Sequence, residues 1–72
     1  MNGMSEKGQD QQRDELLTID EVAVILKVPV ATLRKWRSAG SGPEGFRMGK
    51  HLRFRRSSVD RFITDTEAVE NQ

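Results

Sequence analysis

The side chains best suited to bind a ligand by charge are the Lys and Arg residues in the middle of the chain. Residues 22–56 contain nine of the twelve Lys and Arg residues and a single acid, Glu44, although the net charge of the whole chain is only +1. Residues 1–15 and 64–72 are acidic on balance. A concentrated basic segment attracts a polyanion, so nucleic acid and acidic lipid are the first candidate partners.

Four of the residues that follow Pro29 have the spacing of one helix face. They occur at i, i+3, i+4 and i+7 and are Ala31, Arg34, Lys35 and Ser38, with Thr32 at the edge of the stripe. The opposite face is apolar and consists of Val30, Leu33 and Trp36. An exposed stripe of small, basic and hydroxyl side chains fits the DNA major groove, where Arg can bond both acceptors of guanine. The alternative is that these are ordinary solvated helix residues.

A second basic group follows in an alternating pattern that predicts a β-hairpin. Phe46 and Met48 alternate with Arg47, and Leu52 and Phe54 alternate with basic residues; Gly49-Lys50 suits a two-residue type II′ turn. The basic hairpin candidates for phosphate or minor-groove contact are Lys50, His51, Arg53 and Arg55. The alternative is a solvated edge strand protected by its charge. We expect Trp36 to lie in the core against Phe54 and Phe46.

Helices must position both basic groups. Thr18 and Glu21 form a predicted capping box before a buried stripe in residues 19–26, and Pro29 suits the start of a second helix that Gly40 ends. Ser57 and Asp60 resemble another cap, before a third helix that buries Val59, Phe62 and Ile63. The order predicts a mainly α fold with a small β-hairpin, a winged helix-turn-helix, over residues 16–63. Residues 1–15 are predicted to be a disordered polar tail and residues 64–72 an acidic tail.

Other classes of protein have little support in the sequence. The chain has no Cys and one His, His51, so we expect no metal site and no cofactor. No nucleophile–base pair, phosphate-binding glycine loop or paired carboxylates stand out, so we expect no enzyme. The longest apolar stretch, 22–26, is far shorter than the roughly 20 residues of a membrane span. With no apolar leader at the N-terminus, we expect a cytoplasmic protein, whether Met1 or Met4 is its start.

Three segments together resemble a known family. They are Leu16 to Ala23 (LLTIDEVA), Val28 to Trp36 (VPVATLRKW) and Arg47 to Phe54 (RMGKHLRF). This set resembles the excisionase family of small winged helix-turn-helix DNA-binding proteins, which shares its fold with MerR-type regulators. The resemblance implies a recognition helix in the major groove and a hairpin wing along the backbone or minor groove. By position, the implied contacts are Thr32, Arg34, Lys35, Lys50, His51 and Arg53.

The resemblance implies an excisionase, a recombination directionality factor that binds double-stranded DNA cooperatively, shapes it and assists an integrase. The expected partners are DNA, an integrase and neighbouring copies of the chain on DNA, with no membrane and no small-molecule ligand. The segment Ser41–Gly45 is longer than the family commonly has, and we expect no long dimerisation helix after Ile63. We therefore expect a monomer that assembles on DNA. A small transcriptional regulator of the same fold is the alternative, and a protein-interaction module is a third reading.

Overall fold

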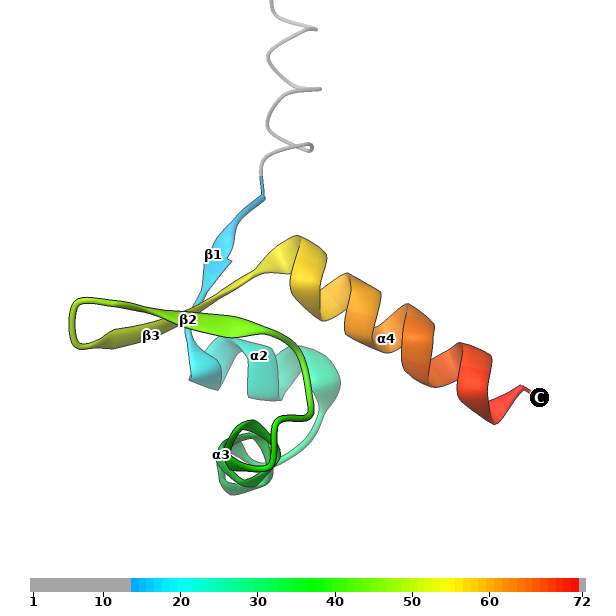
Figure 1. Ribbon diagram of the computed structural model, residues 1–72. Helices are drawn as coiled ribbons and strands as arrows, with labels where there is room; N and C mark the ends of the chain where they lie inside the picture. The colour runs from blue at the N-terminus through cyan, green and yellow to red at the C-terminus, as the bar shows by residue number, and fades with distance from the viewer. Residues whose placement is uncertain (1–13, 72) are drawn as a thin grey trace, which may run out of the picture.

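A computed structural model describes residues 14–71, which form three helices and one small antiparallel sheet (Figure 1). The elements are β1 Leu16–Leu17, α2 Ile19–Leu26, α3 Val30–Ser38, β2 Gly45–Met48, β3 His51–Arg55 and α4 Arg56–Glu70. The strands lie in the order β1-β3-β2, so β3 is central. The predicted fold class, a mainly helical winged helix-turn-helix, is confirmed, and the prediction for residues 1–13 lies outside the described residues.

The first helix of the helix-turn-helix begins and ends at defined caps. Thr18 accepts a hydrogen bond from the Glu21 amide at 3.1 Å, and the Glu21 carboxylate accepts one from the Thr18 amide at 2.8 Å. This reciprocal pair is the predicted capping box, which satisfies two amides that the helix itself leaves unpaired. At the other end Lys27 adopts a left-handed conformation, φ 58°, and turns the chain toward Pro29, the N-cap of α3.

Gly40 ends α3, as its sequence predicts. Its φ of 79° lies in the left-handed region, where a residue without Cβ is not strained. The Ser41 amide donates to the Trp36 carbonyl at 2.8 Å and the Gly40 amide donates to the Arg37 carbonyl at 3.1 Å. These two bonds are the Schellman pattern, which satisfies carbonyls at a helix end.

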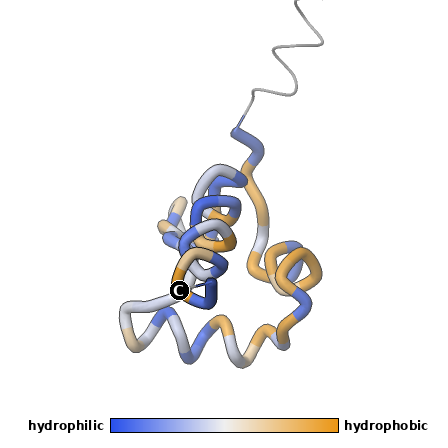
Figure 2. Tube along the Cα trace, turned by 90° about the vertical axis from the view of Figure 1, so that its right-hand side faces the viewer, coloured by the Kyte–Doolittle hydropathy of each residue, from blue (hydrophilic) through white to orange (hydrophobic). Residues whose placement is uncertain are grey.

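The core lies where α2, α3 and α4 meet the inner face of the sheet. Its buried members are Leu17, Ile19, Val22, Ala23, Leu33, Phe54 and Val59. Figure 2 shows the hydrophobic run that continues from β1 into α2. Trp36 is half-buried against this core, but its aromatic neighbour is Phe62, with ring centroids 5.6 Å apart. The expected packing of Trp36 against Phe46 is wrong, because Phe46 lies on the other face of the sheet.

The sequence does not reveal β1, which pairs with β3 through Leu16↔Arg55 and Leu17↔Phe54. The Arg56 amide donates to the Glu15 carbonyl at 2.9 Å and extends this pairing. The predicted N-terminal tail, residues 1–15, therefore extends too far, since its last two residues contact the domain. A two-residue strand is too short to show a period, and its partner is almost forty residues away in the chain.

The third helix is longer than predicted. We expected its buried stripe to end at Ile63 and residues 64–72 to be a tail, but α4 continues to Glu70. Residues 64–70 are exposed, so they show no buried apolar stripe from which a helix could be predicted. They also contain no Gly or Pro, so nothing in them breaks the helix. Of the helices in residues 14–71, none combines the length and the apolar character needed to cross a membrane.

Candidate nucleic-acid interface

The outward face of α3 carries the predicted stripe. Leu33 is buried, with 3% of its surface exposed, and Val30 and Trp36 are half-buried, as the inward stripe requires. The side chains of Arg34, Lys35 and Ser38 are exposed, and Thr32 at the edge is half-buried. The helix therefore presents two cations and two hydroxyl groups to a ligand, and packing fixes the direction in which they point.

Arg47 joins this face, although the sequence analysis did not single it out. In the hairpin register Arg47 pairs with Leu52, and directly paired residues share one face of a sheet. Leu52 packs against the core, so Arg47 projects on the side of α3. A hollow between α3 and the hairpin is lined by Arg34, Arg37, Ser38, Arg47 and Leu52. Counting from the turn would have revealed this, since a two-residue loop pairs residues 48 and 51 and hence 47 and 52.

Arg37 connects the two sides of that hollow. Its Nη1 donates to the Gly45 carbonyl at 3.3 Å, so the last turn of α3 bonds to the first residue of β2. Gly45 lies against the ring of Phe54, and a Cβ at residue 45 would come within 2.7 Å of a ring carbon. These contacts fix where the hairpin starts relative to α3.

The other predicted hairpin residues lie on the opposite, outer face. The paired residues there are Leu16 with Arg55, Phe46 with Arg53, and Met48 with His51. The alternation within each strand is as expected, but Phe46 and Met48 share a face with the basic residues rather than with Leu52 and Phe54. The short turn causes this, because it places Met48 directly opposite His51.

Two of the outer basic side chains are engaged within the protein. Arg53 is half-buried, and its Nη1 donates to the Leu52 carbonyl at 2.8 Å. The Arg55 guanidinium lies 3.7 Å from the Asp14 carboxylate and 5.9 Å from the centroid of the Phe46 ring. Lys50 and His51, at the tip of the hairpin, are exposed. The predicted site residues thus fall into an α3-facing group, a hairpin tip and an outer sheet face.

The family assignment follows from comparison with known proteins. Residues 16–66 match the family model described as a helix-turn-helix domain. The match covers more than half of the chain. The chain belongs to this helix-turn-helix family. The family includes excisionase-like small DNA-binding proteins, and membership indicates DNA binding. A search of curated proteins gives no significant match.

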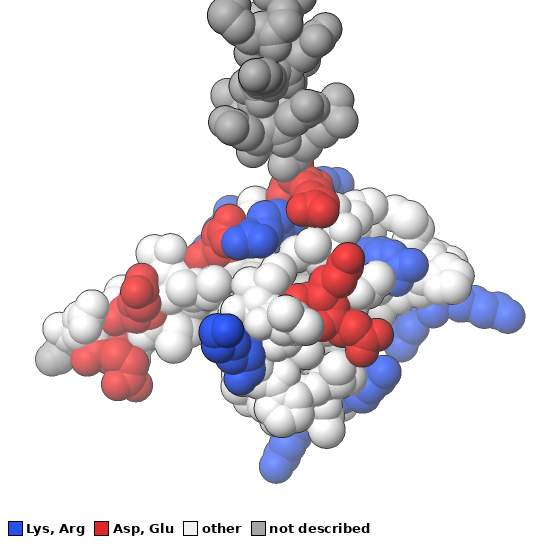
Figure 3. All heavy atoms as spheres, turned by 180° about the vertical axis from the view of Figure 1, so that it is seen from behind, with Lys and Arg blue, Asp and Glu red and all other residues white. Residues whose placement is uncertain are grey.

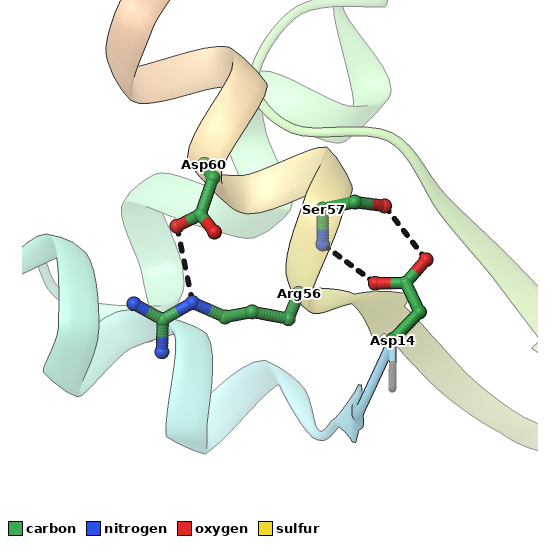
Figure 4. A network of polar contacts seen from close by, with 4 residues as sticks. All are labelled: Asp14, Arg56, Ser57 and Asp60. Atoms are coloured by element: carbon green, nitrogen blue, oxygen red, sulfur yellow. Dashed lines mark hydrogen bonds and ion pairs between the residues drawn. The ribbon is translucent and has the colours of Figure 1, made fainter. Parts of the chain in front are cut away.

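Asp14 holds the end of the hairpin of this helix-turn-helix protein in place, and sequence reasoning missed it. Its carboxylate accepts hydrogen bonds from the Ser57 amide at 2.8 Å and from the Ser57 hydroxyl at 2.7 Å (Figure 4). The hydrogen bonds from the Ser57 side chain and then from its backbone lower the pKa of Asp14 below its ordinary value of 3.8. Desolvation opposes them, and the charge of Arg55 makes the least contribution to the lowering. The expected Ser57–Asp60 cap is therefore wrong: Asp14 fills that role.

The partner of Asp60 is Arg56, one turn earlier on α4, with Nε and Oδ1 3.0 Å apart (Figure 4). No single-residue signal marks Asp14, because it lies 43 residues from Ser57 in the chain.

Charge is separated along the helix-turn-helix domain. The α3 helix has three Lys and Arg residues and no acid, and residues 45–55 have four and no acid. Residues 64–70 of α4 have three acids and no base. Figure 3 shows acidic side chains at the end of α4 and basic ones toward the hairpin, at opposite sides of that view. A polyanion is therefore attracted to α3 and the hairpin and repelled by the end of α4.

Proposed function

We propose that this helix-turn-helix protein binds duplex DNA with α3 in the major groove and the tip of the hairpin at the backbone or minor groove. The proposed contacts are Thr32, Arg34, Lys35, Arg37, Ser38, Arg47 and Lys50. The observation that carries the proposal is the hollow in which α3 and the hairpin present Arg34, Arg37 and Arg47 together. With Arg34 toward the bases, guanidinium groups from two elements, Arg37 and Arg47, match a curved phosphate backbone better than cations on one helix would.

The contacts divide by role. Arg34 is in the middle of the exposed stripe, where a side chain reaches base edges and can bond both guanine acceptors, so we assign it to base reading. Lys50 is at the exposed turn of the hairpin, and its ammonium group can bind a phosphate as a point charge. Arg47 lies between them, and we assign it to the phosphates at the edge of the groove.

We further propose that the biological role is that of an excisionase, which binds beside an integrase and favours excision of a mobile element. The resemblance of three segments to that family and the membership in a family that includes such proteins support this role. Cooperative assembly of several copies on adjacent sites is part of the proposal. An integrase is the expected protein partner.

The length of α4 favours a second candidate, a small transcriptional regulator. Regulators of this fold dimerise through a helix after the wing, and α4 reaches Glu70 with Val69 exposed over 70% of its surface. The apolar residues in 64–70 are only Ala68 and Val69, which is a narrow seam for a stable dimer. We therefore keep the excisionase as the first proposal.

An excision assay separates the two candidates. A plasmid with a short element between attachment sites is incubated with the integrase encoded nearest to this gene, with and without the protein. We expect excision only with the protein and none with Arg34→Ala, whereas Asp20→Asn, at an exposed residue in the first turn of α2, retains activity. Unchanged excision with and without the protein, together with repression of a nearby promoter, would favour the regulator.

A further inference from the structure

The outer face of the sheet has no covering element among residues 14–71, and its composition is unusual for a solvated surface. The central strand presents a column of three basic residues: His51, Arg53 and Arg55. Each is paired with an apolar residue of an edge strand, and these residues are Met48, Phe46 and Leu16. Met48 is 50% exposed and Leu16 40% exposed. A basic column between apolar columns fits a ligand that is both acidic and apolar.

The same chain contains a segment with the complementary chemistry. The last two turns of α4, residues 64–70, have three acids and no base, and Val69 lies on the same side of the helix as Asp65, four residues earlier. This side continues the stripe of Phe62, which packs against Trp36 nearer the start of the helix. The end of α4 thus extends an inward-facing stripe past the body that would cover it.

We propose that the outer sheet face binds the acidic end of α4 of a second copy. Asp65 and Glu70, on either side of Val69, would face the basic column, and Val69 would lie against the apolar columns. Glu67 lies on the other side of the helix. This inference rests on the proposed function in one respect only, that several copies bind adjacent sites on DNA. It also gives His51 and Arg53 a partner other than the duplex that α3 binds, while Arg55 keeps its pairing with Asp14.

The position of the two surfaces allows copies to join in series. Figure 1 shows the hairpin and the end of α4 pointing in opposite directions from the body. A contact between unlike surfaces leaves one of each free at the ends, so further copies can add. The contact between two copies is small and its ion pairs are exposed, so it is weak in free solution. Binding to adjacent DNA sites raises the effective concentration of copies to roughly millimolar, where a weak contact is populated.

Site-directed cross-linking tests the contact, since the natural chain has no Cys. Met48→Cys and Val69→Cys proteins, one of them tagged, are mixed on a duplex with tandem sites and treated with a short bismaleimide. We expect a product between the two proteins, at least about fivefold more than from Asp20→Cys mixed with Val69→Cys, in line with local enrichment by docking. Equal yields from the two mixtures, or a product mainly between two Val69→Cys copies, would overturn the proposal.

Removal of charge tests the same contact without cross-linking. Asp65→Asn/Glu70→Gln is compared with Asp20→Asn/Glu44→Gln, which removes two acids elsewhere. We expect the first pair of changes to lower cooperativity on tandem sites roughly threefold to tenfold, as for two exposed ion pairs, and the second pair to leave it unchanged. Equal cooperativity in both variants would contradict the proposal.

The two proposals fail in distinguishable ways. A duplex with one site reports DNA binding alone, so tight binding there without cross-linking on tandem sites rejects only the docking contact. If the protein does not bind DNA, the cross-linking mixtures are repeated without DNA at roughly millimolar protein, the effective concentration that tandem sites would give. A higher yield of cross-linked product from the Met48→Cys mixture than from the Asp20→Cys control then supports the contact without DNA. Equal yields from the two mixtures reject the contact.

Discussion

Replacement of Gly45 by Ala should destabilise the domain by filling space that Phe54 already occupies. A Cβ at residue 45 would be 2.7, 3.0 and 3.1 Å from three carbons of the Phe54 ring, where ordinary contact begins near 3.4 Å. The ring is only 3% exposed and pairs with Leu17 on the inner face of the sheet, so it cannot swing into solvent. Overpacking of this kind costs about 1–3 kcal/mol. In a domain of this size each kcal/mol lowers Tm by roughly 4–8 °C.

Thermal and urea unfolding followed by circular dichroism would measure this cost in two backgrounds. In the natural chain, we expect the full penalty for Gly45→Ala. In a Phe54→Leu chain, which lacks the ring, the same change should cost less, with a coupling of about 0.5–3 kcal/mol between the two residues. An equal penalty in both backgrounds would refute the steric reasoning and assign the effect to the backbone of Gly45.

Three further outcomes follow from the contacts. Arg34→Ala should weaken cognate DNA binding by about 1–3 kcal/mol and reduce the preference for the cognate over a scrambled duplex. Arg55→Ala is the control, because the Arg55 guanidinium pairs with Asp14, and it should change that preference little. Titrations on both duplexes measure the preference, and an unchanged preference in Arg34→Ala would contradict the assignment of Arg34 to the DNA-facing side of α3. Thr18→Ala should lower the free energy of unfolding by about 0.5–2 kcal/mol while Thr18→Ser retains it, which urea unfolding measures; equal stability of all three would show that the cap contributes nothing. Asp14→Asn should be less stable than the natural chain at neutral pH. Because folding lowers the pKa of Asp14, this difference in the free energy of unfolding should persist above pH 3.8, the ordinary pKa, and shrink as the pH falls below that value. A stability difference that does not change with pH would contradict the role of the charged carboxylate.

The parts of the fold that depend on local pattern could be predicted from the sequence. The capping box at Thr18, the left-handed Gly40 and the two-residue turn at Gly49 each need only a few adjacent residues, and all three are present. The inward stripe of α3 was also predictable, because a helix repeats its faces within two turns. These features were enough to place Arg34 and Lys35 on the exposed face.

The parts that depend on distant pairing could not be predicted. The strand β1 and the contact of Asp14 with Ser57 join segments about forty residues apart, and neither leaves a period in the sequence. The division of the hairpin into two faces was predictable in principle, since the turn length sets the register; the alternation within each strand does not by itself say which face of β2 joins which face of β3. The extension of α4 has no buried face to mark it, so hydrophobic pattern predicted too early an end.

The dependence of DNA affinity on salt tests the central claim most directly. Five cations lie on α3 and the α3-facing side and tip of the hairpin: Arg34, Lys35, Arg37, Arg47 and Lys50. If the four other than Arg34, which reads bases, displace counterions from phosphates, the logarithm of the affinity for one site should fall against the logarithm of salt concentration with a slope of roughly −4. Arg47→Ala should make the slope shallower by about one. A slope near zero would contradict DNA binding through this face.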